Sequence, residues 1–439
     1  MRSPRSSLLL AFLFLPAALS LAFPCTVTAD CPDTLVGNAN KYCASGLCGF
    51  RCRSGFRLSE TAPTCTLAAT TTAAPAATTC APTYTGGATT VRGTGTLPKP
   101  TQFVSRQGQQ LRVGGQNYRI VGQNIYWLCS DENVPPVGAP PTKTRVREAL
   151  AIAVAMGANT LDIRDYVLYA AREYGLRVIL PLTDNYDYYH GGKYDFLDFV
   201  GASRSNNGVL FYTSAAAIAA YGTYIQRSLS RVNQYTGISY AQDPTILAWE
   251  TGNELGGYIN SEAWPPASWT NQTIDFIRAI DTNHLILDGS LTLFRARSDG
   301  SHAGQSSQRP RVDIVSDHGY PRNLGILNTE LGLATAANKA FVIGEYDWRT
   351  GGSVSLASYL SRIESSGSYL GDMIWNVMGH DSQCCAFVQH NDGYSLYYPN
   401  GNTAALRANI LQVVRHWYRV TGRAVPNSLP AVACPQPVF

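Results

Sequence analysis

Short apolar segments alternate with longer amphipathic ones along most of the chain. From residue 98 onward, helix-like stretches such as 144–157 and 166–175 precede strand-like stretches such as 158–164 and 176–184. The strand-like stretches are short and almost continuously apolar, which is typical of a parallel sheet covered by helices. Eight of them can be counted from 120–127 onward. The pattern therefore predicts an α/β fold, a (β/α)8 TIM barrel over residues 98–430.

A doubly wound open sheet is the main alternative to the barrel. Nucleotide-binding members of that class carry a glycine-rich loop directly after the first strand. No such loop follows 120–127, and the RGTGTL motif at 92–97 lies in a low-complexity segment. The sequence therefore gives no support to a nucleotide-binding version.

The first 22 residues differ from everything that follows. Two arginines precede a leucine-rich run that ends in the small-residue site Ser20-Leu21-Ala22. This pattern predicts a secretory signal peptide at 1–22, with cleavage after Ala22. A membrane anchor is the alternative, but the apolar run is short for spanning a bilayer. We therefore expect a secreted, extracellular protein that is not bound to a membrane.

Cysteines are concentrated near the amino terminus. Six of the eleven lie between residues 25 and 65, in a segment without histidine. This spacing predicts a small disulfide-rich module at 23–66, with a zinc site as the weaker alternative. Residues 67–97 are rich in Thr, Ala, Gly and Pro, a composition that cannot bury a core and is typical of a linker. The formal net charge of +4 is small and dispersed, so we expect no nucleic-acid partner.

Polar and aromatic residues collect where the predicted strands end. In a barrel of this kind the carboxyl ends of the strands form the active face. The candidates there are Trp127 after strand one, Asn253 and Glu254 after strand four, His318 and Tyr320 after strand six, Glu345 in strand seven and Trp375 in strand eight. Any one of them alone would be an ordinary capping, paired or core residue. Their concurrence at one face predicts a catalytic site.

Two carboxylates on different strands of one barrel fit glycoside hydrolysis. One must be protonated to help the leaving oxygen depart, while the other attacks the anomeric carbon or activates water. Glu254 and Glu345 are the candidates, and a retaining enzyme would hold them about 5–5.5 Å apart. We expect Asn253 to contact a sugar hydroxyl, Tyr320 to align Glu345, His318 to face the substrate, and Trp127 and Trp375 to stack on sugar rings. Core packing is the alternative for both tryptophans.

Several of these motifs resemble one enzyme family. ILAWETGNEL, SDHGYP, FVIGEYDW and MIWNVMGHD resemble the ends of strands four, six, seven and eight in glycoside hydrolase family 5. GQNIYWL and LPLTDNYDYYHGGKYDF resemble most the fungal endo-β-1,4-mannanase-like members. The resemblance covers most of residues 100–422, and the tyrosine-rich stretch 185–196 is expected to wall the cleft.

The resemblance implies a specific chemistry and substrate. It implies a retaining double displacement, with Glu254 as acid/base and Glu345 as nucleophile, and without a metal or organic cofactor. We expect a monomer that cleaves internal β-1,4 links of a cell-wall polysaccharide, mannan first. The alternatives are a β-1,4-glucanase on the same fold and a catalytically impaired wall-binding or adhesion protein.

A further expectation concerns the cysteines of the barrel. Cys129 is expected to form a disulfide with Cys384 or Cys385, because the first and last strands of a closed barrel are neighbours. A vicinal Cys384–Cys385 bond is the alternative, and Cys80 and Cys434 would be left over.

The second unit of the barrel is unusually short. The strand at 158–164 runs almost directly into the next helix, whereas this loop is often long in barrel enzymes. The family carries an arginine at the end of strand two, and that role cannot be assigned to Arg164. A missing stretch of sequence is the favoured cause and a natural short loop the alternative. We therefore expect the 439-residue chain to be poorly active or unstable.

Overall fold

The computed structural model describes two parts of the chain, residues 1–80 and 81–439, each taken by itself. The described residues are 20–24, 39–44, 47–52, 56–58, 65–67, 97–161, 165–187, 191–257, 264–290, 311–349, 352–366, 369–390 and 392–436. Most of the predicted signal peptide and linker lies outside them, so these two assignments stay predictions.

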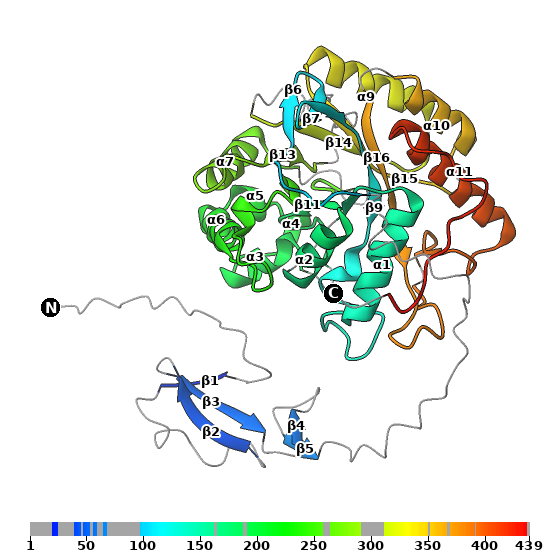
Figure 1. The fold of residues 1–439 in the computed structure, drawn as a ribbon. Helices are drawn as coiled ribbons and strands as arrows, with labels where there is room; N and C mark the ends of the chain where they lie inside the picture. The colour runs from blue at the N-terminus through cyan, green and yellow to red at the C-terminus, as the bar shows by residue number, and fades with distance from the viewer. Residues whose placement is uncertain are drawn as a thin grey trace. The chain divides into compact units, whose positions relative to one another are not determined.

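The larger part contains a closed barrel of eight parallel strands (Figure 1). The strands are β9 (Ile120–Asn124), β10 (Thr160–Leu161), β11 (Arg177–Pro181), β12 (Ile246–Glu250), β13 (Leu285–Asp288), β14 (Ile314–Gly319), β15 (Ala340–Tyr346) and β16 (Tyr369–Trp375). They follow one another in sequence order, and β16 closes the barrel on β9. The predicted TIM-barrel fold is confirmed.

Helices surround the barrel and connect its strands (Figure 1). They are α1 (Lys143–Met156), α2 (Asp165–Tyr174), α3 (Lys193–Phe199), α4 (Ser205–Gly208), α5 (Leu210–Thr213), α6 (Ala215–Ser230), α7 (Ala267–Arg278), α9 (Leu324–Ala336), α10 (Leu356–Glu364) and α11 (Ala404–Val420). Their ends carry the usual signals: Thr142 caps α1 through its side chain, and Gly157 ends it at φ +98°.

One predicted helix is shorter in the structure than its sequence pattern. The pattern predicts a helix over 215–235, but α6 ends at Ser230 because the backbone becomes extended at Arg231. Val232 then forms an isolated antiparallel bridge with Ser239, and Gly237 turns the chain at φ +70°. Apolar residues continue past this point, so hydrophobic periodicity alone does not show where the helix stops.

Two apolar layers hold the barrel together. Side chains that alternate along each strand point either into the barrel, as Ile179 and Val342 do, or outward against the helices, as Val178 and Phe341 do. The small antiparallel sheet of β6 (Ser105–Gln107), β7 (Gln110–Val113) and β8 (Gln116–Tyr118) adds buried Leu111 to the inner layer. The polar residues of the strand ends therefore rest on a rigid scaffold.

The second barrel unit is as short as the sequence predicts. β10 contains two residues, and α2 begins at Asp165, four positions after the end of β10 at Leu161. Thr160 still pairs with Gly122 of β9 and with Arg177 of β11, so the barrel closes. Arg164 lies outside the described residues. The shortened unit thus preserves the sheet but supplies very little chain to the active face.

The amino-terminal part contains two small antiparallel sheets. β1 (Ser20–Pro24), β3 (Leu47–Cys52) and β2 (Ala39–Ala44) form one, in that order, and β4 (Phe56–Leu58) pairs with β5 (Cys65–Leu67) in the other. β2, β3 and β4 lie within the predicted module at 23–66, whereas β1 begins inside the predicted signal peptide and β5 ends at Leu67, the first residue of the predicted linker. The cysteine side chains of the module lie outside the described residues, so the predicted disulfides there remain a prediction.

The predicted disulfide of Cys129 is wrong. Cys384 is bonded to Cys434, fifty residues away in sequence, and Cys385 is also disulfide-bonded. Cys129 is a thiol in the structure. The prediction assumed that cysteines after neighbouring strands would meet, but the carboxyl-terminal segment returns to the loop after β16 and brings Cys434 there instead.

Among the described residues, no single helix is long and apolar enough to cross a membrane. One bent pair, Ser205–Thr213 with Ala215–Ser230, is long and apolar enough by length and composition alone.

Candidate active site

Glu254 lies on a tight turn just beyond the end of β12. The strand ends at Glu250, and Gly252 follows at φ +145°, where an added Cβ would lie 2.7 Å from Thr183 Cγ2. Glu254 itself has φ +49°, in the left-handed region that few non-glycine residues adopt. Such strain is common at functional sites, where the surrounding structure enforces it. The turn holds this carboxylate away from the core and toward the neighbouring strand ends.

Two side chains from other strands hold the Glu254 carboxylate. His318 Nδ1, on β14, lies 2.6 Å from Glu254 Oε1. The Tyr186 hydroxyl, beyond β11, donates to Glu254 Oε2 at 2.8 Å. Both Glu254 oxygens therefore have a partner, and both partners come from the same end of the barrel.

Glu345 lies directly opposite His318 in the parallel pairing of β14 with β15. Its Oε2 accepts a hydrogen bond from the Tyr320 hydroxyl at 3.2 Å and lies 3.7 Å from His318 Nδ1. One ligand atom from each of Glu254, His318 and Glu345 falls within 4.8 Å of the others. This closeness agrees with the carboxylate separation of about 5–5.5 Å expected for a retaining glycosidase and not with the wider spacing of an inverting one.

Burial and mutual proximity control the protonation of this cluster. The pKa of Glu345 is raised to about 8, chiefly by burial and also by nearby Glu254, while His318 and the Tyr320 hydroxyl oppose the rise. For His318, burial alone would lower the pKa, but Glu345 and Glu254 outweigh it and raise the pKa to about 10. At neutral pH His318 is therefore an imidazolium placed between two carboxyl groups.

The same three side chains form a potential metal-ligand set, with one imidazole and two carboxyl groups. A histidine binds a metal through an unprotonated nitrogen. Because the raised pKa of His318 favours the imidazolium, the cluster suits proton transfer better than metal binding.

Asn253 occupies the position next to Glu254. Its Nδ2 donates to Asp184 Oδ2 at 3.0 Å, and the backbone of Asn253 pairs with that of Asp184. Asp184 also accepts from the Tyr186 backbone N–H at 2.7 Å. Asp184 thus fixes both the Asn253 amide and the tyrosine that contacts Glu254.

Trp375 lies at the end of β16 and is partly exposed. Its indole Nε1 donates to Asp392 Oδ2 at 2.5 Å, and its ring stacks on Tyr126 with centroids 5.2 Å apart. The Tyr126 hydroxyl in turn lies 2.9 Å from His390 Nδ1. These contacts hold the indole plane in one orientation.

Trp127 does not line the cleft, so the prediction that it stacks on sugar is wrong. The chain leaves β9 in a 3-10 helix over Tyr126–Leu128, which turns Trp127 into the core. Its side chain is 0% exposed, its Nε1 donates to the Val377 carbonyl at 2.9 Å, and the Arg145 guanidinium lies over its ring. Core packing, the alternative for Trp127, is what the structure shows, and the adjacent Tyr126 stacks on Trp375 instead.

Tyr126, Asp184 and Tyr186 lie at strand ends in the sequence, and Tyr186 falls in the stretch expected to wall the cleft. The sequence predicts no specific contact at the site for them or for Asp392. Asp184 and Tyr186 follow the carboxyl end of β11, so the rule that identified the other residues applies to them as well. Asp392 lies in a long connection after β16, and no periodic pattern marks it. His190, in the same tyrosine-rich stretch as Tyr186, lies outside the described residues.

Comparison with known proteins agrees with this geometry. Residues 202–346 match the family model for GH family 5 beta-mannosidase-like proteins, which confirms the predicted resemblance. Mannan endo-1,4-beta-mannosidase 1 of Oryza sativa subsp. japonica is 32% identical over 178 residues, covering 37% of this chain and 41% of that protein. Mannan endo-1,4-beta-mannosidase A of Hypocrea jecorina is 25% identical over 285 residues, covering 61% of each. The chain thus matches less than two thirds of the length of either relative.

Solved structures share the fold. The endo-1,4-beta-mannanase of Rhizomucor miehei superposes with a TM-score of 0.58 at 18% identity, covering 73% of this chain and 100% of that one. The endo-beta-1,4-mannanase of Thermotoga petrophila gives a TM-score of 0.58 at 19% identity, covering 71% and 79%. These structures support the barrel independently of the sequence motifs.

Proposed function

We propose that this protein is a secreted, retaining glycoside hydrolase that cleaves internal β-1,4 links of mannan. The observation that carries the proposal is the pairing of Glu254 and Glu345, with an oxygen of each and His318 Nδ1 within 4.8 Å of one another at the carboxyl end of the barrel. The names of the relatives support mannan as the substrate. The predicted signal peptide at 1–22 supports secretion, and we expect a monomer.

The reaction takes two displacements at the anomeric carbon. In the first, an oxygen of Glu345 bonds to this carbon as the glycosidic C–O bond breaks, and the Glu254 carboxyl gives its proton to the departing oxygen. A glycosyl ester of Glu345 results. In the second, water attacks the same carbon, its proton passes to Glu254, and the ester bond to Glu345 breaks.

The neighbouring side chains prepare the two carboxyl groups for these roles. His318 and Tyr186 hold Glu254 in place, and Tyr320 aligns Glu345 through its hydroxyl. Asn253 is placed to contact the hydroxyl beside the reacting carbon. Trp375 and Tyr126 offer an aromatic platform for a sugar ring. None of these steps requires a metal or an organic cofactor.

A reducing-sugar assay on mannan, glucomannan, carboxymethyl-cellulose and xylan tests the proposal. We expect release from mannan first, loss of turnover in Glu345→Gln, and in Glu254→Ala a slowing that is greatest for poor leaving groups. Unchanged melting temperatures would show that both variants fold. Hydrolysis by either variant at the parent rate would contradict the assigned roles, and preference for carboxymethyl-cellulose would favour a β-1,4-glucanase.

One observation favours a second candidate, a catalytically impaired wall-binding protein. The groups that stabilise the ionised form of Glu345 are His318 and Tyr320, and its pKa is nevertheless raised to about 8. A nucleophile that is largely protonated at neutral pH is weak. Binding to insoluble mannan without release of reducing sugar would support this candidate.

A further inference from the structure

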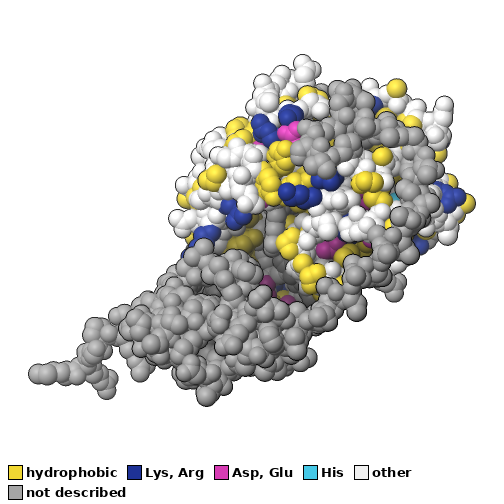
Figure 2. All heavy atoms as spheres, turned by 60° about the horizontal axis from the view of Figure 1, so that its bottom comes forward, with side chains coloured by type: hydrophobic (Ala, Val, Ile, Leu, Met, Phe, Trp, Pro, Cys, Tyr) yellow, Lys and Arg dark blue, Asp and Glu magenta, His cyan; other side chains and the backbone are white. Residues whose placement is uncertain are grey.

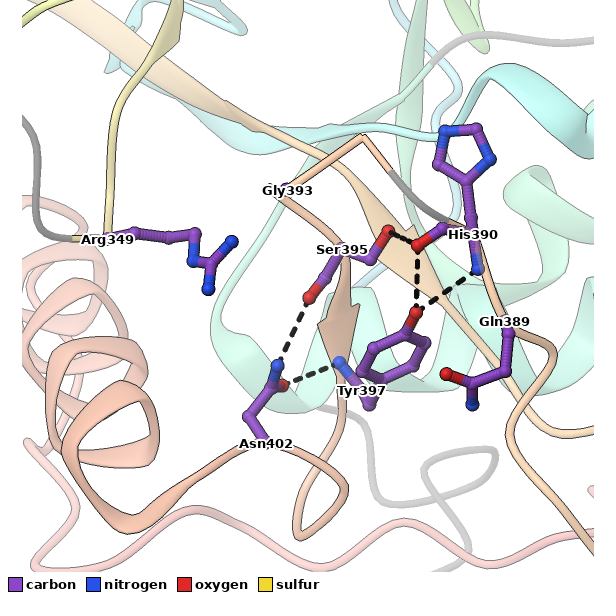
Figure 3. A pocket seen from close by; sticks show the side chains of 7 residues that line it. All are labelled: Arg349, Gln389, His390, Gly393, Ser395, Tyr397 and Asn402. Carbon is purple, nitrogen blue, oxygen red and sulfur yellow. Dashed lines mark hydrogen bonds between the residues drawn. The ribbon is translucent and has the colours of Figure 1, made fainter.

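A cavity lies between the loop after β15 and the long connection after β16 (Figure 3). Its volume is about 380 Å³, within the range of small-ligand sites. Arg349, four residues beyond Glu345, forms one wall. The other wall is formed by Gln389, His390, Gly393, Ser395, Tyr397 and Asn402.

The connection that lines the cavity also contacts the candidate active site. The Tyr394 ring packs edge-on against Tyr320, which donates to Glu345, with centroids 5.1 Å apart. Asp392 accepts from Trp375 Nε1, and His390 lies against Tyr126. The connection that forms one wall of the cavity therefore also holds Trp375 and Tyr126 in place.

Most polar groups of the cavity wall are already engaged with one another. Asn402 Oδ1 accepts from the Tyr397 N–H at 2.7 Å, and Asn402 Nδ2 donates to the Ser395 carbonyl at 3.1 Å. The Ser395 and Tyr397 hydroxyls both donate to the His390 carbonyl, at 3.0 Å each. These bonds fix the shape of the wall without requiring a ligand.

Arg349 is the exception. Its Nε is buried and has no hydrogen-bond partner among the described residues, and Figure 3 shows its guanidinium directed toward the opposite wall. Gly393 faces it without a side chain: an added Cβ would lie 3.6 Å from Arg349 Nη1. The His390 imidazole points away from the cavity, toward Tyr126. The lining residues, all in the described part of the chain, include no carboxylate.

A guanidinium in this setting selects a planar anion. It binds a carboxylate through two parallel charge-assisted hydrogen bonds, which a neutral sugar hydroxyl cannot reproduce. We propose that the Arg349 cavity binds the carboxylate of a uronic acid unit on the polysaccharide. This inference rests on the proposed function, because a polysaccharide in the cleft is what would carry such a unit to the cavity.

The test measures binding of sodium D-glucuronate to the full chain, with D-glucose as the neutral counterpart, by saturation-transfer NMR. We expect glucuronate to bind about tenfold or more tightly than glucose, because the difference is a charge-assisted bidentate contact. Arg349→Gln should reduce glucuronate binding to the level of glucose, and Arg349→Lys should retain part of it. Arg362, a partly exposed arginine of α10, does not line the cavity, so Arg362→Gln is the matched control and should bind as the parent does.

Three outcomes would overturn the inference. They are equal binding of glucuronate and glucose, unchanged glucuronate binding in Arg349→Gln, and equal affinity for sodium sulfate and glucuronate, which would indicate an anion site without sugar recognition. Binding does not require hydrolysis, so the inference can fail independently of the proposed function. Arg349-dependent glucuronate binding by a chain that does not hydrolyse mannan would leave the cavity assignment intact and contradict only the activity.

Discussion

At the residue scale, the chemistry depends on His318 and the two carboxyl groups beside it. Its Nδ1 lies 2.6 Å from Glu254 and 3.7 Å from Glu345, so one positive charge serves both. The imidazolium favours the ionised form of Glu345, yet the pKa of this group is still raised to about 8, chiefly by burial. His318 is thus the positive charge that limits the rise in the pKa of the proposed nucleophile.

This dependence predicts a displaced pH profile. Glu345 must be ionised to attack, so kcat/KM should rise with pH around a midpoint of about 8. This midpoint lies above the pKa of an unperturbed glutamate. Removing the charge in His318→Gln should move this rising limb upward by about one pH unit or more, since an opposite charge at this distance lowers a carboxyl pKa by about that much. The measurement is kcat/KM on a soluble manno-oligosaccharide from pH 5 to pH 10, with the melting temperature followed in parallel.

A different pH profile would contradict this prediction. A rising limb near pH 4 to 5 in the parent chain, unmoved in His318→Gln, would show that burial does not govern Glu345. His416→Gln is a suitable comparison, because His416 is also buried between two carboxylates but lies on α11, away from the barrel face that carries Glu345. Its substitution should leave the limb where it is.

At the element scale, the strands and their polar ends could be predicted from the sequence. A buried parallel strand is continuously apolar, so the interruption at Gly252-Asn253-Glu254 is visible without coordinates. Trp127 could not be placed in this way, because the 3-10 helix after β9 depends on packing that the apolar pattern does not contain. The Cys384–Cys434 disulfide could not be predicted for a similar reason, because no local sequence pattern shows where the carboxyl-terminal segment returns to the barrel.

The Cys384–Cys434 disulfide should contribute substantially to the free energy of unfolding. It links residues separated by 50 positions, and the loss of closure entropy in the unfolded chain corresponds to about 4 kcal/mol. We expect the double substitution Cys384→Ser with Cys434→Ser to lower the free energy of unfolding by roughly this amount, as measured by denaturant titration. Cys129→Ser, which removes a thiol, should change it little. Equal effects of the two would contradict the assignment.

The short connection between β10 and α2 predicts weak catalysis by this chain. β10 ends at Leu161 and α2 begins at Asp165, so little chain is available to wall the cleft or to bring a cation to Glu345. We expect the 439-residue protein to hydrolyse mannan at least about tenfold more slowly than a version with a longer, arginine-containing loop at this point. Sequencing of full-length transcripts would show whether such a version exists.

Mannan hydrolysis by the 439-residue protein and by the version with the longer loop should be compared directly. Strong hydrolysis by the 439-residue form would overturn the prediction of impairment. Weak activity in both forms would instead show that the cause of the low activity lies outside the connection between β10 and α2.

At the scale of the whole molecule, the chain joins a small strand-rich part to a large barrel. The two divide near residue 80, and the predicted linker at 67–97 covers the boundary. On the face shown in Figure 2, the described Lys and Arg side chains lie in separate small groups. Among its described residues, this face therefore lacks the continuous basic stripe that binding to a nucleic acid backbone requires.

Deleting residues 23–66 should leave catalysis on soluble oligosaccharides unchanged. The predicted module has its own cysteine framework and the barrel has its own core, so neither needs the other to fold. We expect activity on insoluble wall material to fall by a few fold, through loss of local concentration. Parallel assays on manno-oligosaccharide and insoluble mannan test this, and a truncated protein that does not fold would show that the module packs on the barrel.

The central claim is that Glu345 forms a covalent bond to the sugar while Glu254 acts as acid and base. Labelling with an activated 2-deoxy-2-fluoro-mannoside tests it most directly, because a good leaving group needs no acid and the fluorine slows the second step. This allows even a weakly active chain to accumulate the ester during a long incubation. Peptide mass mapping should then find the added sugar on the peptide that contains Glu345, and no label in Glu345→Gln. A label on Glu254, or mannan hydrolysis with inverted anomeric configuration, would contradict the account.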